Sequence, residues 1–161
     1  MSKHPTAILF AASEADPWCK TGGLAEVLEA IPKLFQQPDN PEFPSEAFCF
    51  IPLYRKVIDY AERKQKVLEK TNINVHADLN GHRFHGTILK YDPKKHGENG
   101  ATFFFVECGE LFDRDGIYND SRYRSFTHND IRYAFFCHAI LQSATKLIGR
   151  PPDIIHCHDW Q

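Results

Sequence analysis

Long apolar runs are missing from this 161-residue sequence. No stretch approaches the roughly 20 consecutive apolar residues of a membrane-spanning helix, so we expect no membrane partner. The apolar run that begins at Thr6 is short and is soon followed by Glu14 and Asp16, which is not the pattern of a signal peptide. Internal repeats and low-complexity tracts are missing too, which leaves an ordinary globular fold.

Paired cysteines are also missing. The chain has five cysteines, an odd number, and no two of them show the Cys-x-x-Cys spacing. Three lie within apolar runs, where cysteine behaves as a small buried hydrophobic residue: Cys49, Cys137 and Cys157. This usage favours a reducing compartment over a disulfide framework, and we expect a cytoplasmic protein.

A strong excess of either charge is absent, since the formal net charge is −2. The densest basic stretch, residues 63–70, is interrupted by Gln65 and Glu69 and is typical of a solvated helix face. We therefore expect no nucleic-acid partner. The hydrophobic content of 42% and the length of 161 residues fit one domain with a substantial core, spanning residues 1–161.

Two periodicities divide the chain into strands and helices. Continuous apolar runs predict strands buried on both faces at residues 6–12, 47–53, 101–107 and 153–158. Alternation around Asn80-Gly81, the preferred pair of a type I′ turn, predicts a β-hairpin over residues 73–91. Residues 38–45, 93–100 and 113–126 are predicted to be turns or loops.

Apolar residues at helical spacing predict three helices, at residues 24–35, 55–69 and 129–148. Pro32 is expected to kink the first helix or to end it early. Gly149 and the following prolines fit the end of the third helix. The alternation of strands and helices predicts an α/β fold: a Rossmann-like, doubly wound, mostly parallel sheet with an inserted β-hairpin.

Polar residues follow two of the predicted strands, at residues 13–23 and 156–161. Ligands bind at the carboxyl ends of strands in such sheets, so both clusters are candidate sites. In the first, Lys20-Thr21-Gly22-Gly23 stands before a helix, where amide groups and the helix dipole attract an anion. Glycines admit a close phosphate and the lysine adds a cation, but the order is neither G-x-G-x-x-G nor Walker A. A plain tight turn stays open as the alternative.

A longer set of motifs carries a family resemblance. The chain contains ILFAASEADPWCKTGGLAEVLEAIPK, then Asp115-Gly116-Ile117-Tyr118, Phe126-Thr127-His128-Asn129-Asp130, Arg132-Tyr133-Ala134 and Pro152-Asp153-Ile154-Ile155-His156-Cys157-His158-Asp159-Trp160. In order and spacing these resemble the glycogen and starch synthases of the bacterial, ADP-glucose-using type. The resemblance covers essentially the whole chain. It implies the N-terminal half of a B-type glycosyltransferase fold, in which two Rossmann-like domains face a cleft.

The resemblance also implies an activity, retaining transfer of glucose from ADP-glucose to the non-reducing end of an α-1,4-glucan. Lys20, Gly22 and Gly23 match family positions at the donor diphosphate, and Glu26 stands where the family usually has Asp. The alternative for Glu26 is an acid that complements the helix dipole. The loop around His128 departs from the family pattern, so little about residue roles is carried over from the family there.

Three more residues match positions at the acceptor side of the cleft: Tyr118, Asp159 and Trp160. For the two aromatic residues the alternative is a place in the core. His156 and His158 alternate onto one face of a strand, which suits a metal, but two ligands are too few. Buried, hydrogen-bonded histidines are the better interpretation, and no metal or cofactor is predicted.

The family's catalytic histidine and glutamate would lie beyond Gln161, so no catalytic residue is expected within residues 1–161. We expect an incomplete N-terminal domain without its C-terminal partner domain, inactive alone and weak in binding ADP-glucose. Two alternatives stay open. One is a two-domain glycosyltransferase with a UDP-sugar donor, and the other is a non-catalytic glucan-binding module.

Overall fold

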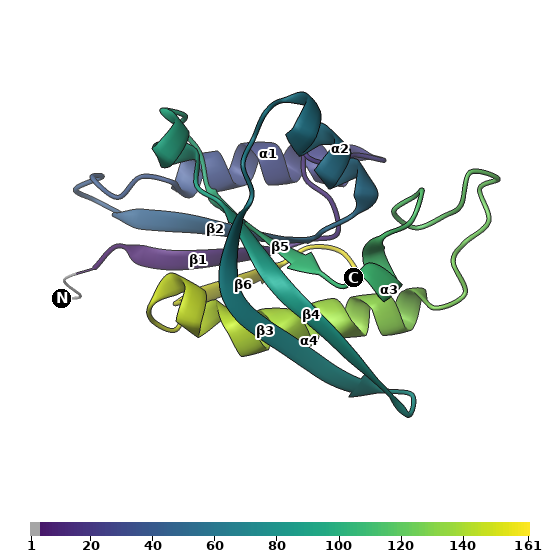
Figure 1. The fold of residues 1–161 in the computed structure, drawn as a ribbon. Helices are drawn as coiled ribbons and strands as arrows, with labels where there is room; N and C mark the ends of the chain where they lie inside the picture. The colour runs from purple at the N-terminus through teal and green to yellow at the C-terminus, as the bar shows by residue number, and fades with distance from the viewer. Residues whose placement is uncertain (1–3) are drawn as a thin grey trace.

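A six-stranded sheet runs through residues 4–161, the part of the chain described by the computed structural model (Figure 1). Its strand order is β3-β4-β5-β2-β1-β6. The strands in that order are β3 Glu69–Leu79, β4 His82–Tyr91, β5 Thr102–Glu107, β2 Ser45–Pro52, β1 Thr6–Ala11 and β6 Ile154–Cys157. β5, β2, β1 and β6 run parallel, and the β3–β4 hairpin joins β5 in the antiparallel sense. The predicted α/β sheet with its inserted hairpin is confirmed.

Helices cover both faces of the sheet, as Figure 1 shows. α1 (Gly23–Phe35) and α2 (Arg55–Arg63) lie on one face, and α4 (Asn129–Ile148) lies on the other. Two short elements complete the fold, the 3-10 helix η1 (Pro93–His96) and the helix α3 (Gly109–Phe112). Neither was predicted as a helix from the sequence. Among residues 4–161, no helix combines the length and the apolar character needed to cross a membrane.

The hairpin turn and the end of α4 follow their sequence signals. Asn80 and Gly81 have φ values of 51° and 76°, the pair of left-handed residues that a type I′ turn requires. Gly149 ends α4 with a φ of 85°, and its amide donates to the carbonyl of Thr145. Glycine reaches this conformation without the steric cost that a Cβ would impose.

One helix prediction was wrong in extent, and one was correct. The helix predicted at residues 55–69 ends at Arg63, and β3 begins at Glu69. Lys66 explains the early end, because its ammonium group bonds the Tyr91 hydroxyl at 2.8 Å and draws the segment toward the hairpin. α1 covers Gly23–Phe35, as the predicted range 24–35 has it, and it does not end early at Pro32, which is buried within the helix.

The prediction that three cysteines are buried was correct for Cys49 and wrong for Cys137 and Cys157. Cys137 on α4 and Cys157 on β6 are exposed, whereas Cys19 and Cys108 are buried. For Cys157 the cause is the position of β6 at the sheet edge, where within residues 4–161 it pairs with β1 alone. Its apolar side chains stay accordingly open, with Ile154 44% and Ile155 47% exposed.

The opposite edge of the sheet, formed by β3, is treated differently. The side-chain amide of Gln142 on α4 accepts from the His76 amide at 3.1 Å and donates to the His76 carbonyl at 2.6 Å. The β3–β4 register also shifts between Lys70 and Asn74, and Asn72 has a φ of 60°. A side chain therefore occupies backbone groups that an adjoining strand would otherwise use.

Candidate functional site

The segment between β1 and α1 is folded tightly onto the sheet. Ala15 and Cys19 exchange two backbone hydrogen bonds of 3.1 and 3.0 Å, and the Asp16 amide donates to the carbonyl of Ala25 in α1. Trp18 is 3% exposed, with its ring edge-on to Phe105 at 4.9 Å between ring centroids. This anchoring holds the following residues, the glycine turn, at the carboxyl end of β1.

A buried carboxylate that the sequence analysis missed stabilises that turn. Glu14 is 3% exposed and accepts hydrogen bonds from the Thr21 amide, from the Thr21 hydroxyl at 2.9 Å and from the Gly22 amide at 3.3 Å. It also accepts from the Tyr118 hydroxyl at 3.2 Å. The protein thus places its own anion at the entrance to α1, where the helix dipole favours negative charge.

The two glycines beyond Glu14 face open space. A Cβ built on Gly22 or Gly23 would meet no atom within 4 Å, and Gly22 has an extended φ of −153°. Neither the backbone conformation nor a neighbouring atom therefore requires glycine here. Within residues 4–161, no backbone hydrogen bond outside the helices uses the amide of Gly23 or Leu24, the first donors of α1. The turn offers free amide donors and room for a ligand to approach them.

Lys20 and Glu26, both predicted at the donor side, are in direct contact. The Lys20 ammonium lies 2.6 Å from a Glu26 carboxylate oxygen and 3.3 Å from Asp16. The hydrogen bond from Lys20 lowers the pKa of Glu26, and the bonds to Glu26 and then Asp16 raise the pKa of Lys20. Lys20 stays charged and exposed, and its two carboxylate partners neutralise it in this structure.

Tyr118, predicted at the acceptor side, joins the same cluster. Its hydroxyl bonds Ser13 and Glu14, and burial raises its pKa well above the ordinary value. Ile117, the residue before Tyr118, is held by the fully buried Arg132. The Arg132 guanidinium donates to the carbonyls of Leu111 and Ile117 at 2.7 Å each. Arg132 belongs to a quoted motif, but its clamping of this loop was not predicted.

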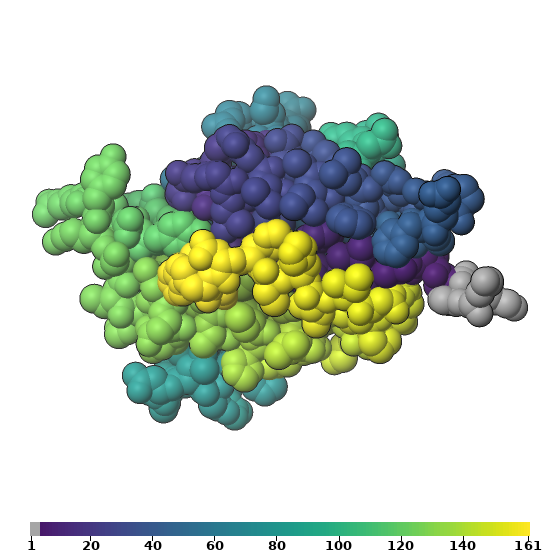
Figure 2. Space-filling model, turned by 180° about the vertical axis from the view of Figure 1, so that it is seen from behind, coloured from purple at the N-terminus to yellow at the C-terminus, as the bar shows by residue number. Residues whose placement is uncertain are grey.

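Asp159 and Trp160 lie at the carboxyl end of β6, next to that of β1. The His158 amide donates to the Ala11 carbonyl at 3.0 Å, which ties the two strand ends together. Asp159 has a φ of 61° and accepts from the Trp160 amide at 2.8 Å. In Figure 2 the yellow C-terminal residues lie between the N-terminal segment in purple and blue and the yellow-green helix α4.

Aromatic rings link the two strand ends. Trp160, 63% exposed, meets the Tyr133 ring edge-on at 5.3 Å, and Tyr133 lies 6.1 Å from the Tyr118 ring. Tyr133 also bonds the buried Tyr54 hydroxyl at 3.1 Å, and burial raises its pKa to about 12. Asp159 is not drawn into this group, because its carboxylate bonds only the neighbouring amide among the described residues.

The histidines of β6 were predicted to be buried and hydrogen-bonded. His156 is exposed, so that interpretation was wrong for it, for the reason given for Cys157: β6 is an edge strand. His158 is half-buried, and its Nε2 has no hydrogen-bond partner in residues 4–161. The same described residues hold no cluster of three or more histidine, cysteine, aspartate or glutamate side chains suited to a metal ion.

Known proteins resemble this chain over nearly all of its length. The family model of the starch synthase catalytic domain matches residues 7–161. A glycogen synthase of Geotalea uraniireducens is 34% identical over 155 residues, covering 96% of this chain and 28% of its own length. A glycogen synthase of Elusimicrobium minutum is 36% identical over 154 residues, covering 96% and 29%.

A solved structure shows the same fold. The catalytic domain of starch synthase IV from Arabidopsis thaliana, bound to ADP and acarbose, superposes with a TM-score of 0.70 at 21% identity. The match covers 98% of this chain and 28% of that one. The chain therefore spans somewhat more than a quarter of the length of these relatives.

Proposed function

The chain belongs to the starch synthase catalytic domain family, and on that premise we propose that it forms one wall of a glucosyltransferase cleft. The reaction is transfer of glucose from ADP-glucose to the non-reducing end of an α-1,4-glucan, with retention of anomeric configuration. The observation that supports it most is the open glycine turn, where a Cβ on Gly22 or Gly23 would meet no atom within 4 Å, beside the free amides of Gly23 and Leu24. Such a turn suits a diphosphate.

The donor side works by stabilising the departing nucleoside diphosphate. Negative charge grows on that group as the bond to glucose breaks. Fixed amides and a lysine ammonium lower the free energy of the transition state because they need no reorganisation. Lys20 reaches the diphosphate by exchanging its contacts with Glu26 and Asp16, of 2.6 and 3.3 Å, for phosphate oxygens. Glu26 then turns to hydroxyl groups of the donor.

The acceptor side offers a different kind of contact. The Trp160 indole, 63% exposed, presents an apolar face on which a pyranose ring can pack. The Asp159 carboxylate can accept hydrogen bonds from sugar hydroxyls. Tyr118 borders both sides, because its hydroxyl bonds the same Glu14 that supports the glycine turn.

This chain corresponds to only part of the length of its relatives, which limits the activity we expect from it alone. It spans 28–29% of its glycogen synthase relatives. Holding donor and acceptor together in a closed cleft is worth about 7–11 kcal/mol of barrier in good cases. We therefore expect the 161-residue chain to bind ADP weakly and to transfer no glucose at a synthase rate.

Binding and transfer test the proposal separately. Binding of ADP and UDP to this chain is measured by calorimetry, and transfer to glycogen is measured in the protein expressed from its natural reading frame, including any residues coded after Gln161. Lys20→Ala is compared with Lys95→Ala, whose lysine is also exposed and paired, with Glu69 at 2.8 Å.

We expect ADP to bind and ADP-glucose to be used, with both lost in Lys20→Ala and kept in Lys95→Ala. Use of UDP-glucose instead would leave a glycosyltransferase with another donor. Glucan binding without transfer from either donor would leave the non-catalytic binding module.

A further inference from the structure

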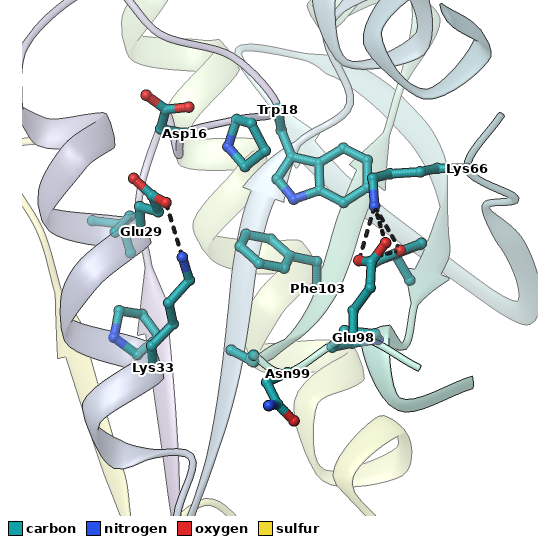
Figure 3. Close-up of a pocket in the computed structure, with 15 residues that line it drawn as sticks. Asp16, Trp18, Glu29, Lys33, Lys66, Glu98, Asn99 and Phe103 are labelled. Carbon is teal, nitrogen blue, oxygen red and sulfur yellow. Dashed lines mark hydrogen bonds and ion pairs between the residues drawn. The ribbon is translucent and has the colours of Figure 1, made fainter. Parts of the chain in front are cut away.

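A second cavity, outside the glycine turn, opens on the flank of α1 (Figure 3). It has a volume of about 190 Å³ and lies between α1, the loop of residues 16–18 and the segment of residues 98–103. Its apolar wall includes Trp18 and Phe103, and polar side chains from α1 and from the opposite segment line the remainder. None of the residues assigned above to donor or acceptor binding lines it.

Trp18 has a donor without a protein partner at this cavity. The side chain is 3% exposed and lines the cavity, and none of the hydrogen bonds found among residues 4–161 uses its indole N–H. In Figure 3 the indole nitrogen lies on the side of the ring that faces Phe103 and α1. Because this N–H is not among the buried polar atoms left without a partner in residues 4–161, it is open to the solvent of the cavity, where a buried tryptophan ring can still donate a hydrogen bond. A ligand that enters the cavity can therefore accept this hydrogen bond.

The rim of the cavity consists of paired charges. Glu29 and Lys33 of α1 form an ion pair of 2.8 Å. On the other side Glu98 pairs with Lys66 at 2.8 Å and accepts from the Tyr91 hydroxyl at 2.7 Å. Because each of these carboxylates already has a lysine, the rim favours a neutral ligand over an ion.

The hydrogen-bonding groups of the cavity further restrict the class of ligand that it can bind. The carboxylates only accept, the lysines and the indole only donate, and the Asn99 amide does both. Hydroxyl groups meet all of these needs, because each of them donates and accepts. A nucleobase offers flat faces but few donors for the carboxylates. A ring rich in hydroxyl groups, with an apolar face toward Phe103, fits better.

We propose that this cavity binds one pyranose ring of a neutral sugar, either a free hexose or the end residue of a glucan. Its volume of about 190 Å³ has room for one such ring. For a ligand of this size the expected dissociation constant is millimolar. The inference does not depend on the proposed donor and acceptor residues.

Tryptophan fluorescence tests the proposal directly, because the chain has two tryptophans, Trp18 and Trp160. In Trp160→Phe the remaining signal reports the cavity alone, and the proposed acceptor contact is gone. The variant is titrated with glucose, maltohexaose and adenine, with acrylamide quenching as a second readout. Glucose should change the Trp18 emission and reduce its quenching. A response to glucose alone indicates a free hexose, and a response to both sugars indicates a chain end.

Two substitutions in that background locate the site. Asn99→Ala and Glu29→Gln should each weaken sugar binding about tenfold through a lost hydrogen bond. Glu42→Gln, an exposed residue away from the cavity, should leave binding unchanged. Circular dichroism confirms that each variant is folded. An unchanged Trp18 signal with both sugars, a response to adenine only, or equal binding in all three variants would overturn the proposal.

Discussion

The carboxyl ends of β1 and β6 are neighbours in one sheet, but the protein supports them differently. After β1, the buried Glu14 accepts from Thr21, Gly22 and Tyr118 and fixes the glycine turn from within. After β6, the exposed Asp159 bonds only the next amide. The first region is preorganised by internal contacts, whereas backbone pairing positions the second. We expect stability to depend mainly on the first, and surface contacts with ligands to be free to form at the second.

The largest contrast is expected between two residues that face each other across the strands. Leu9 in β1 pairs in register with Ile155 in β6, and their exposed fractions are 0% and 47%. Leu9→Ala should lower the free energy of unfolding by about 2–5 kcal/mol, because it leaves a cavity in a closed core. Ile155→Ala should cost about 1 kcal/mol or less. Urea denaturation measures both, and equal losses would contradict the comparison.

The second largest difference in stability is expected between substitutions of the two carboxylates, Glu14 and Asp159. Glu14→Gln retains one acceptor oxygen but places an NH₂ group against amide donors, so it should cost about 1–3 kcal/mol of unfolding free energy. Asp159→Asn removes a charge at an exposed position and should cost about 0.5 kcal/mol or less. Chemical denaturation again decides. If Glu14→Gln proved as mild as Asp159→Asn, internal support of the turn would be refuted.

A third substitution separates binding from stability at the glycine turn. Gly22→Ala should change the unfolding free energy by no more than about 0.5 kcal/mol, because φ is −153° and the new Cβ meets no atom within 4 Å. ADP binding should weaken at least about tenfold, since the methyl group would occupy the space proposed for the diphosphate. Calorimetry tests this, with Gly109→Ala, at an equally open glycine, as the control. Unchanged ADP affinity in Gly22→Ala would argue against the proposed diphosphate position.

The smallest effect is a pH dependence at the end of β6. Burial and then the neighbouring His156 lower the pKa of His158 below 6.5. Because the unfolded chain then binds the proton more readily, the contribution of His158 to stability is present above about pH 6.5 and is lost as the pH falls. Denaturation at several pH values should show a slope in this range that His158→Gln reduces. His138→Gln on α4 should keep the slope.

Local sequence patterns predicted most of the secondary structure. They failed where contacts between residues far apart in the sequence determine burial and hydrogen bonding. The hairpin around Asn80-Gly81 and the helix at residues 129–148 appeared as expected, because turn chemistry and helical spacing are local. Glu14 was missed because its burial and its bond to Tyr118, 104 residues away in sequence, depend on the tertiary fold. The apolar run at residues 153–158 indicated a buried strand, but a run of residues does not reveal how many neighbours cover it.

The contact between Gln142 and His76 has a consequence for how copies of the chain can associate. One edge of the sheet is interrupted at His76 by that amide and by the irregular pairing near Asn72, whereas β6, within residues 4–161, has unpaired backbone groups on its outer side. When one sheet edge pairs more readily than the other, a two-fold pair is favoured over a fibre, which needs complementary surfaces at both ends. Sedimentation at rising concentration should therefore show dimers as the largest species, and Gln142→Ala should allow longer polymers.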